Sequence, residues 1–223
     1  MPTSAPRHRP PGRPRLDELS VPTADQIVQA AAELFMELGY RAVTMEKVAE
    51  RSGVTKAAVY YHFADKAALL TTALVALFGR VRASSEAILE RDEPLRLRLL
   101  ALAQAILRLP EPLTRVELLL RVARDDLSED QLAAIAEASD AVGAAVAATM
   151  REGVRRGEIR DVDPLLLGHM FIDLVRVGHA RAADGTPLFP DPERGARTFV
   201  DILWNGVGAG GAASTEEDAL GTW

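Results

Sequence analysis

The chain contains no cysteine, which excludes disulfide bonds and thiolate metal sites. A cysteine-free sequence suits a reducing cytoplasm, where we expect the protein to act. Charged residues interrupt the apolar stretches at helical spacing, so we expect no run long enough to span a bilayer and no contact with membranes. No apolar segment follows the basic N-terminal stretch, which argues against a signal peptide.

Alanine, leucine, glutamate and arginine dominate the chain, whereas aromatic residues make up only 5% of it and runs of β-branched residues are scarce. This composition favours an all-α fold. The 223 residues suffice for one large domain or two small ones with apolar cores.

The net charge of −6 is unevenly distributed. Residues 1–70 carry 9 Lys+Arg and 8 Asp+Glu, whereas residues 71–223 carry 17 and 24. The acidity therefore lies in the C-terminal two-thirds. The N-terminal third can present a locally positive surface, which is what nucleic-acid binding requires.

Two terminal segments are expected to lack regular structure. Residues 1–22 hold six of the 13 prolines and four arginines, which predicts an extended basic arm. Residues 208–223 are rich in glycine and alanine and predict a disordered tail. Between them, apolar periodicity and capping residues predict helices beginning at Thr23, Thr44, Thr55, Asp65, Pro94, Thr114, Ser128, Asp163 and Pro192.

The spacing within residues 44–70 predicts a helix-turn-helix. Ala49 is small enough for two helices to cross closely, and Gly53 can adopt the left-handed conformation that the turn needs. Val59 is placed to anchor the second helix against the first. The rest of the buried side is expected to consist of Val48, Val54 and Phe63.

This arrangement leaves polar side chains facing outward. Their hydroxyl, imidazole and ammonium groups donate hydrogen bonds or charge to phosphates. The small Ala57 lets the backbone approach base edges. The outward set is Thr55, Lys56, Tyr60, Tyr61 and His62. Without the surrounding spacing, the Tyr-Tyr-His group could equally pack at a helix junction.

Residues 23–70 resemble the DNA-binding domain of TetR-family transcriptional regulators. The similarity runs through IVQAAAELF, the Gly39-Tyr40 turn, VAERSGVTKAAVYYHF and the following Asp65-Lys66. It implies that Thr44, Tyr60, His62 and Lys66 contact phosphates. The family often has glycine and threonine where this chain has Ala57-Ala58, so base readout through position 58 loses a hydroxyl.

The arm contains the sequence Pro11-Gly12-Arg13-Pro14-Arg15, which resembles the core of an AT-hook. Arg13 and Arg15 would enter a narrow minor groove, where negative potential is concentrated. The alternative is an unspecific solvated tail.

The resemblance implies a second, helical domain over residues 71–207 that binds an effector and forms a homodimer. Two long helices, about 163–184 and 192–207, would supply the dimer interface. Their aromatic and apolar residues are interface or core candidates: Phe171, Phe199, Leu203 and Trp204. The alternative is a monomer with these residues internal.

The effector is expected to be a mainly apolar small molecule that meets one or two polar groups. Candidate lining residues from facing helices are Leu102, Ile106, Leu119, Leu120, Met150, Met170, Asp173 and Leu174. His169 and Asp173 are spaced for a metal, but no third ligand has a clear position, so a salt-bridged or pocket-lining pair is favoured.

The interpretation that unites these features is a ligand-responsive repressor. A dimer would bind double-stranded DNA at a palindromic operator, and the effector would release it through the helix over residues 65–91. An activator would share the same residues. An all-α enzyme lacks a convergent catalytic set in this sequence, so we expect neither catalysis nor a cofactor. A protein-binding adaptor is the third alternative.

Overall fold

The computed structural model describes residues 24–109 and 112–207. Within these ranges the chain is helical with no strands, as the sequence predicts. The helices are α1 (Ala24–Leu38), α2 (Met45–Ser52), α3 (Lys56–His62), α4 (Lys66–Leu89), α5 (Leu95–Leu107), α6 (Pro112–Ala123), α7 (Glu129–Arg155), α8 (Pro164–Arg176) and α9 (Pro192–Val207), with 3-10 turns at Arg124–Asp126 and Val177–His179.

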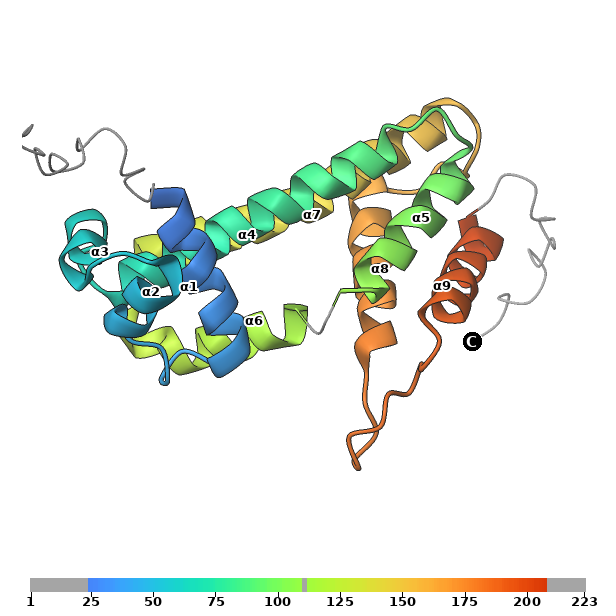
Figure 1. Cartoon of the computed structure of the whole chain (residues 1–223). Helices are drawn as coiled ribbons and strands as arrows, with labels where there is room; N and C mark the ends of the chain where they lie inside the picture. The colour runs from blue at the N-terminus through green and yellow to red at the C-terminus, as the bar shows by residue number, and fades with distance from the viewer. Residues whose placement is uncertain (1–23, 110–111, 208–223) are drawn as a thin grey trace, which may run out of the picture.

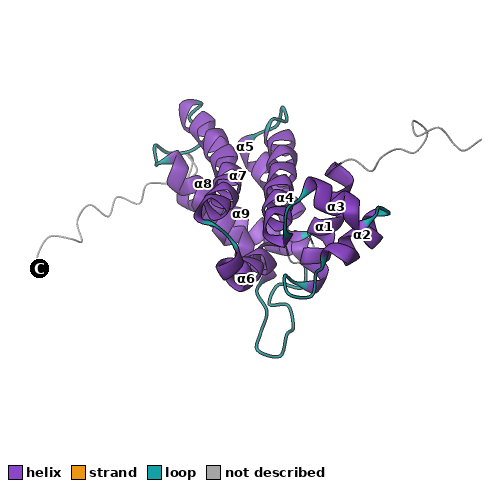
Figure 2. Ribbon diagram, turned by 90° about the vertical axis from the view of Figure 1, so that its left-hand side faces the viewer, coloured by secondary structure: helices purple, strands orange, loops and turns teal. Residues whose placement is uncertain are grey.

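Two long helices, α4 and α7, lie side by side and connect the two ends of the molecule (Figure 1). Helices α1, α2 and α3 form a compact unit at one end, and α6 runs beneath α1. Helices α5, α8 and α9 gather at the other end, and the same grouping is visible from the side (Figure 2). The long pair therefore sets where the small N-terminal unit lies.

Both long helices contain an 18-residue window that could cross a membrane by length and composition, with mean hydropathy 1.3. This corrects the expectation that no such run exists. Both helices contribute side chains to the interior: 33% of the α4 window and 22% of the α7 window is buried. Packing therefore provides a reason for their apolar character.

Local capping explains where the N-terminal helices begin. Thr44, Thr55 and Asp65 each occupy an N-cap position before α2, α3 and α4. Each side chain accepts a hydrogen bond from the backbone N–H three residues later, at 3.3, 3.2 and 2.8 Å respectively. These bonds satisfy N–H groups that a helix start leaves without a partner. The N-cap expected at Thr23 lies outside the described residues.

Gly53 ends α2 in the left-handed conformation, with φ 70° and ψ 24°. The N–H of Val54 then donates to the carbonyl of Ala49 at 2.9 Å, which closes the turn between α2 and α3. This is the conformation that the spacing predicts for a helix-turn-helix.

The buried apolar side chains form two clusters. The first joins α1, α2 and α3 to the beginning of α4, to α6 and to the beginning of α7, around Phe35 and Leu70. The second joins the end of α4 to α5, the later part of α7, α8 and α9, around Phe171. Burying a side chain of this size contributes on the order of 1.5–3 kcal/mol. The first cluster extends well past residue 70, so the expected domain boundary does not separate the two cores.

Helices α7 and α8 approach closely where Gly168 faces Ala147. A Cβ at Gly168 would lie 2.9 Å from the backbone nitrogen of Ala147. Only glycine permits this approach, because real Cβ atoms do not come that close to backbone. The contact fixes α8 against the long pair.

The helix expected over about 163–184 is shorter in the structure. Helix α8 ends at Arg176 and is followed by the 3-10 turn Val177–His179. Gly178 is buried so tightly that a Cβ there would lie 2.3 Å from Cδ2 of Leu107. The chain leaves the helix at this contact and returns to α9 through a loop with a left-handed turn at Gly185. The arm and the tail predicted at the termini lie outside the described residues.

Replacing Gly53 with alanine should lower the free energy of unfolding by about 1–2 kcal/mol, the cost of a left-handed conformation for a residue with a Cβ. No atom lies within 4 Å of the position such a Cβ would take, so crowding adds nothing. Gly79, inside α4, also has open space but carries no positive φ. Gly79→Ala should therefore raise the free energy of unfolding by up to about 1 kcal/mol. Urea unfolding measures the free energy of unfolding of both variants. If both variants are stabilised, or both destabilised, the prediction is wrong.

Candidate nucleic-acid interface and central cavity

Helix α3 presents its polar side chains to solvent and its single apolar anchor to the core. Val59 is completely buried against the first cluster. Tyr60 is 46% exposed and Tyr61 is 86% exposed, and the His62 side chain is also on the surface. A tyrosine ring with this much exposure gains little from packing. The structure therefore places the Tyr-Tyr-His group outward and does not use it as a helix junction.

The first residue of α3 forms an ion pair with α2. The ammonium of Lys56 contacts the carboxylate of Glu46, and it also lies 5.6 Å from the ring centroid of Tyr60. The hydrogen bond from Lys56 lowers the pKa of Glu46 to about 2, and the same partner raises the pKa of Lys56. Both groups are therefore charged at neutral pH.

Lys66, at the start of α4, is only partly exposed and bonds to the loop after α1. Its ammonium donates to the carbonyl oxygen of Tyr40 at 3.2 Å and lies 4.2 Å from the Tyr40 ring centroid. This contact joins α4 to the turn that precedes Thr44. Two of the three ammonium protons remain for another acceptor.

Thr44, Thr55 and Ala57 are also exposed. The two threonines also act as N-caps, so their positions are fixed by the backbone. Ala58 is half-buried. The DNA-binding candidates from residues 44–66 are therefore all exposed or partly exposed, whereas Arg13 and Arg15 lie outside the described residues.

Polar contacts connect this N-terminal unit to α6. The guanidinium of Arg115 donates to the carbonyl oxygens of Met36 and Glu37 at the end of α1. Arg51 of α2 pairs with Glu37 at 2.9 Å, and this contact lowers the pKa of Glu37. Sequence reasoning missed Arg115, because nothing in local spacing shows which arginine reaches a distant helix end.

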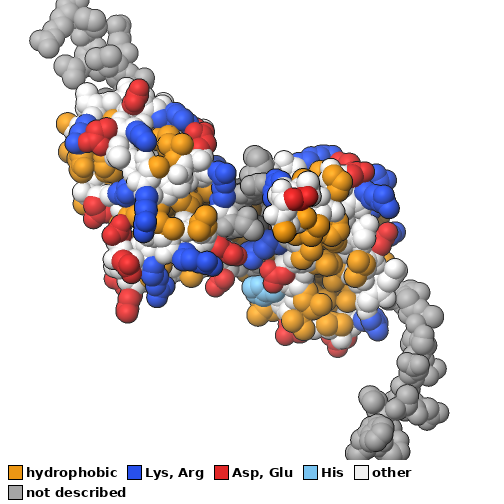
Figure 3. All heavy atoms as spheres, turned by 90° about the horizontal axis from the view of Figure 1, so that it is seen from below, with side chains coloured by type: hydrophobic (Ala, Val, Ile, Leu, Met, Phe, Trp, Pro, Cys, Tyr) orange, Lys and Arg blue, Asp and Glu red, His pale blue; other side chains and the backbone are white. Residues whose placement is uncertain are grey.

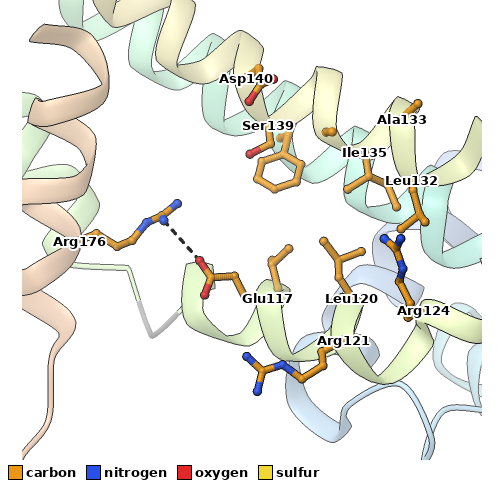
Figure 4. Close-up of a pocket in the computed structure, with 13 residues that line it drawn as sticks. Glu117, Leu120, Arg121, Arg124, Leu132, Ala133, Ile135, Ser139, Asp140 and Arg176 are labelled. Atoms are coloured by element: carbon orange, nitrogen blue, oxygen red, sulfur yellow. Dashed lines mark hydrogen bonds and ion pairs between the residues drawn. The ribbon is translucent and has the colours of Figure 1, made fainter. Parts of the chain in front are cut away.

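A cavity of two adjoining compartments lies between the long helices, α6 and α8. The outer compartment measures about 650 Å³ and the inner about 250 Å³. Side chains from four helices line both: Phe78, Val116, Ser139, Asp140 and Arg176. The close-up shows Arg176 reaching toward Glu117, with Ser139 and Asp140 on the opposite helix (Figure 4). The walls are mainly apolar, with charged groups at the junction.

The effector-binding candidates are only partly at this cavity. Ile106 and Asp173 line the inner compartment and Leu120 the outer one. The other five candidates line neither compartment: Leu102, Leu119 and Met150 are buried in the two clusters, Leu174 packs against the second, and Met170 is 49% exposed. Periodicity identifies which residues face inward, but a core position and a cavity wall look alike in sequence.

Arg176 lies at the junction of the two compartments. Its guanidinium is 3.3 Å from the Glu117 carboxylate of α6 and 3.5 Å from Asp173 of its own helix. Its Nε is buried without a hydrogen-bond partner. His169 packs against Gly143, and Nε2 of His179 lies 3.2 Å from the carbonyl oxygen of Ile106. Within the described ranges, no three His, Asp or Glu side chains are arranged to hold a metal ion.

Three of the four residues considered for dimerisation lie in the core of the single chain. Phe171, Phe199 and Leu203 are buried within the second cluster, so of the two roles considered for them the structure shows the core role. Only Trp204 is partly exposed. The exposed apolar side chains of α8 and α9 are instead Leu165, Leu166, Met170 and Ile202. Seen from below, hydrophobic side chains gather on the half formed by the C-terminal helices, whereas charges are mixed on the other half (Figure 3).

Comparison with known proteins identifies the relatives of this arrangement. Residues 27–73 match the family model described as bacterial regulatory proteins, tetR family. The HTH-type transcriptional repressor Rv1474c of Mycobacterium tuberculosis is 28% identical over 191 residues, which cover 82% of this chain and 91% of the relative.

Solved structures agree with the sequence comparison. A TetR-family transcriptional regulator from Mesorhizobium loti superposes with a TM-score of 0.70 at 25% identity, covering 82% of this chain and 96% of that one. The TetR-family regulator PfmR from Thermus thermophilus superposes with a TM-score of 0.56 at 28% identity, covering 79% and 96%. The likeness thus extends over α1–α9 and beyond the helix-turn-helix.

Replacing Tyr40 with phenylalanine should reduce the loss of stability at alkaline pH. Burial, and then a hydrogen bond with Asp126, raises the pKa of the Tyr40 phenol above the ordinary value of about 10. The unfolded chain releases this proton first, so the native protein loses stability as pH rises from about 10 toward the folded pKa. Urea unfolding between pH 8 and 11 should show a shallower decline for Tyr40→Phe, and equal declines would contradict the assignment.

Proposed function

Because this chain belongs to the TetR family and is a DNA-binding transcriptional regulator rather than an enzyme, we propose that it acts as a dimeric, ligand-responsive repressor in the cytoplasm. The observation behind the proposal is the outward face of α3, where Tyr60, Tyr61 and His62 are exposed while Val59 on the opposite side is buried. The M. tuberculosis relative is named a repressor, which supports repression rather than activation. An activator would share these residues.

The proposed DNA contacts fall into two groups. Thr44, Tyr60, His62 and Lys66 donate to phosphate oxygens, which would give affinity without much sequence choice. Thr55, Lys56, Ala57 and Tyr61 face the groove and would contribute to base readout. Arg13 and Arg15 would add a minor-groove contact from the arm.

Tyr61 provides a clean test of this surface because a change there should not disturb folding. Tyr61→Phe removes one hydroxyl donor and should weaken binding to the DNA flanking its own gene about fivefold, the loss of roughly one hydrogen bond. Binding should also weaken steeply with salt. Arg151→Gln, an exposed change on α7, is the control and should bind like the parent. Fluorescence anisotropy measures the affinity of the parent and of both variants for this DNA. If Tyr61→Phe binds like the parent, Tyr61 is not part of the interface.

Dimerisation is proposed to use the outer faces of α8 and α9. Two recognition helices must lie about 34 Å apart to enter successive major grooves, so a two-fold interface is needed. The exposed apolar residues of these helices, together with Trp204, form a surface that a second copy would cover.

Ile202→Asp should convert the dimer to a monomer, because a buried unpaired carboxylate at an interface is strongly unfavourable. Leu118→Asp on α6 is the matched control: Leu118 is 57% exposed and Ile202 58%. Analytical ultracentrifugation should show a loss of mass only for Ile202→Asp. A parent protein that sediments as a monomer would contradict the proposed dimer.

The effector is proposed to occupy the cavity between the long helices. The two compartments together suit a small molecule of mainly apolar character that meets Asp140 and Arg176. Binding there would act on the N-terminal unit through α4, and also through α6, which contacts α8 by Glu117 and α1 by Arg115. The ligand shifts the protein only by its differential affinity for the two conformations.

A further inference from the structure

The ion pair between Glu46 and Lys56 lies within the proposed DNA-binding surface. Lys56 begins the recognition helix α3, and Glu46 belongs to the first turn of α2. Their side chains are 53% and 56% exposed, so water reaches both groups. The ammonium also lies 5.6 Å from the Tyr60 ring centroid. Lys56 is thus held between two neighbours and does not extend freely toward a ligand.

This contact removes one positive charge from the surface that meets DNA. A carboxylate in that position cancels the ammonium and repels phosphate. The depressed pKa of Glu46 keeps the carboxylate charged throughout the physiological range.

We propose that Glu46 withholds Lys56 from phosphates, so that Lys56 joins the interface only where contacts at a recognised sequence displace the carboxylate. Glu46 is therefore a positioning residue that limits affinity for DNA of arbitrary sequence. The inference depends on the DNA binding proposed above. The alternative role for Glu46 is direct readout, because a glutamate can accept a hydrogen bond from the cytosine amino group.

Salt-dependent binding to a random-sequence duplex tests the proposal. Freeing one lysine per recognition helix should make the slope of log affinity against log salt more negative by about 0.9 per helix. The affinity of Glu46→Gln relative to the parent should therefore be about 3.5-fold greater at 50 mM salt than at 200 mM salt, for each recognition helix. Glu46→Gln should therefore bind random duplex more tightly than the parent, with the steeper slope.

Two further variants separate this effect from general electrostatics. Glu50 lies one helical turn after Glu46, is exposed, and forms no ion pair among the described residues. Glu50→Gln also removes one negative charge, but it frees no lysine. It should therefore raise the affinity for random duplex less than Glu46→Gln does, and leave the slope of log affinity against log salt unchanged. In a Lys56→Met background, Glu46→Gln should give no more than the Glu50→Gln gain, because the lysine it would free is absent.

The outcomes are distinct. Equal gains from Glu46→Gln and Glu50→Gln would overturn the proposal in favour of a bulk charge effect. Weaker operator binding by Glu46→Gln would overturn it in favour of base readout. A parent protein with no salt-dependent duplex binding would contradict the proposed function itself, whereas parent binding with an unchanged Glu46→Gln slope would contradict only the role of Glu46. Circular dichroism confirms that each variant is folded.

Discussion

The packing of α4 against α7 is the constraint on which the rest of the structure depends. These helices contribute to both apolar clusters, so neither end of the molecule has a core without them. The cavity lies along the same pair, with Phe78 from one helix and Asp140 from the other in its walls. Because protein interiors are close-packed, a change of spacing between the two helices cannot be absorbed locally. It must move the elements packed at either end.

The polar contacts of the N-terminal unit serve position more than stability. The ion pairs of Arg51 and Lys56 are exposed, and exposed pairs contribute little to stability because water screens them. Burial of Val59 and Phe35 stabilises the unit far more. Exposed pairs therefore determine where charges lie on a surface that the core has already fixed. A change at the exposed Glu46 is therefore expected to leave the fold intact.

Local chemistry made the helix-turn-helix predictable from sequence. Thr44, Gly53 and Asp65 act on backbone within four residues of themselves, so their roles can be inferred without knowing the fold. The end of α8 and the cavity walls depend on contacts between distant segments. Gly178, just past the end of α8, lies against Leu107 of α5, and Arg176 faces Glu117 across the cavity. Sequence left Phe171 open between core and interface for the same reason, since apolar periodicity does not distinguish an internal face from a face covered by a partner.

Arg176 connects the cavity to the N-terminal unit through α6. Its contact with Glu117 is a single ion pair at 3.3 Å, and Glu117 lies two residues from Arg115, which holds the end of α1. The Arg176 side chain is 34% exposed, so the pair is partly screened by water and is weak. A ligand acceptor that engages the unpartnered Nε would compete with Glu117 for the same guanidinium. In the proposed mechanism, the apolar contacts of α4 and α7 would carry this change toward the N-terminal unit, because both helices belong to both apolar clusters.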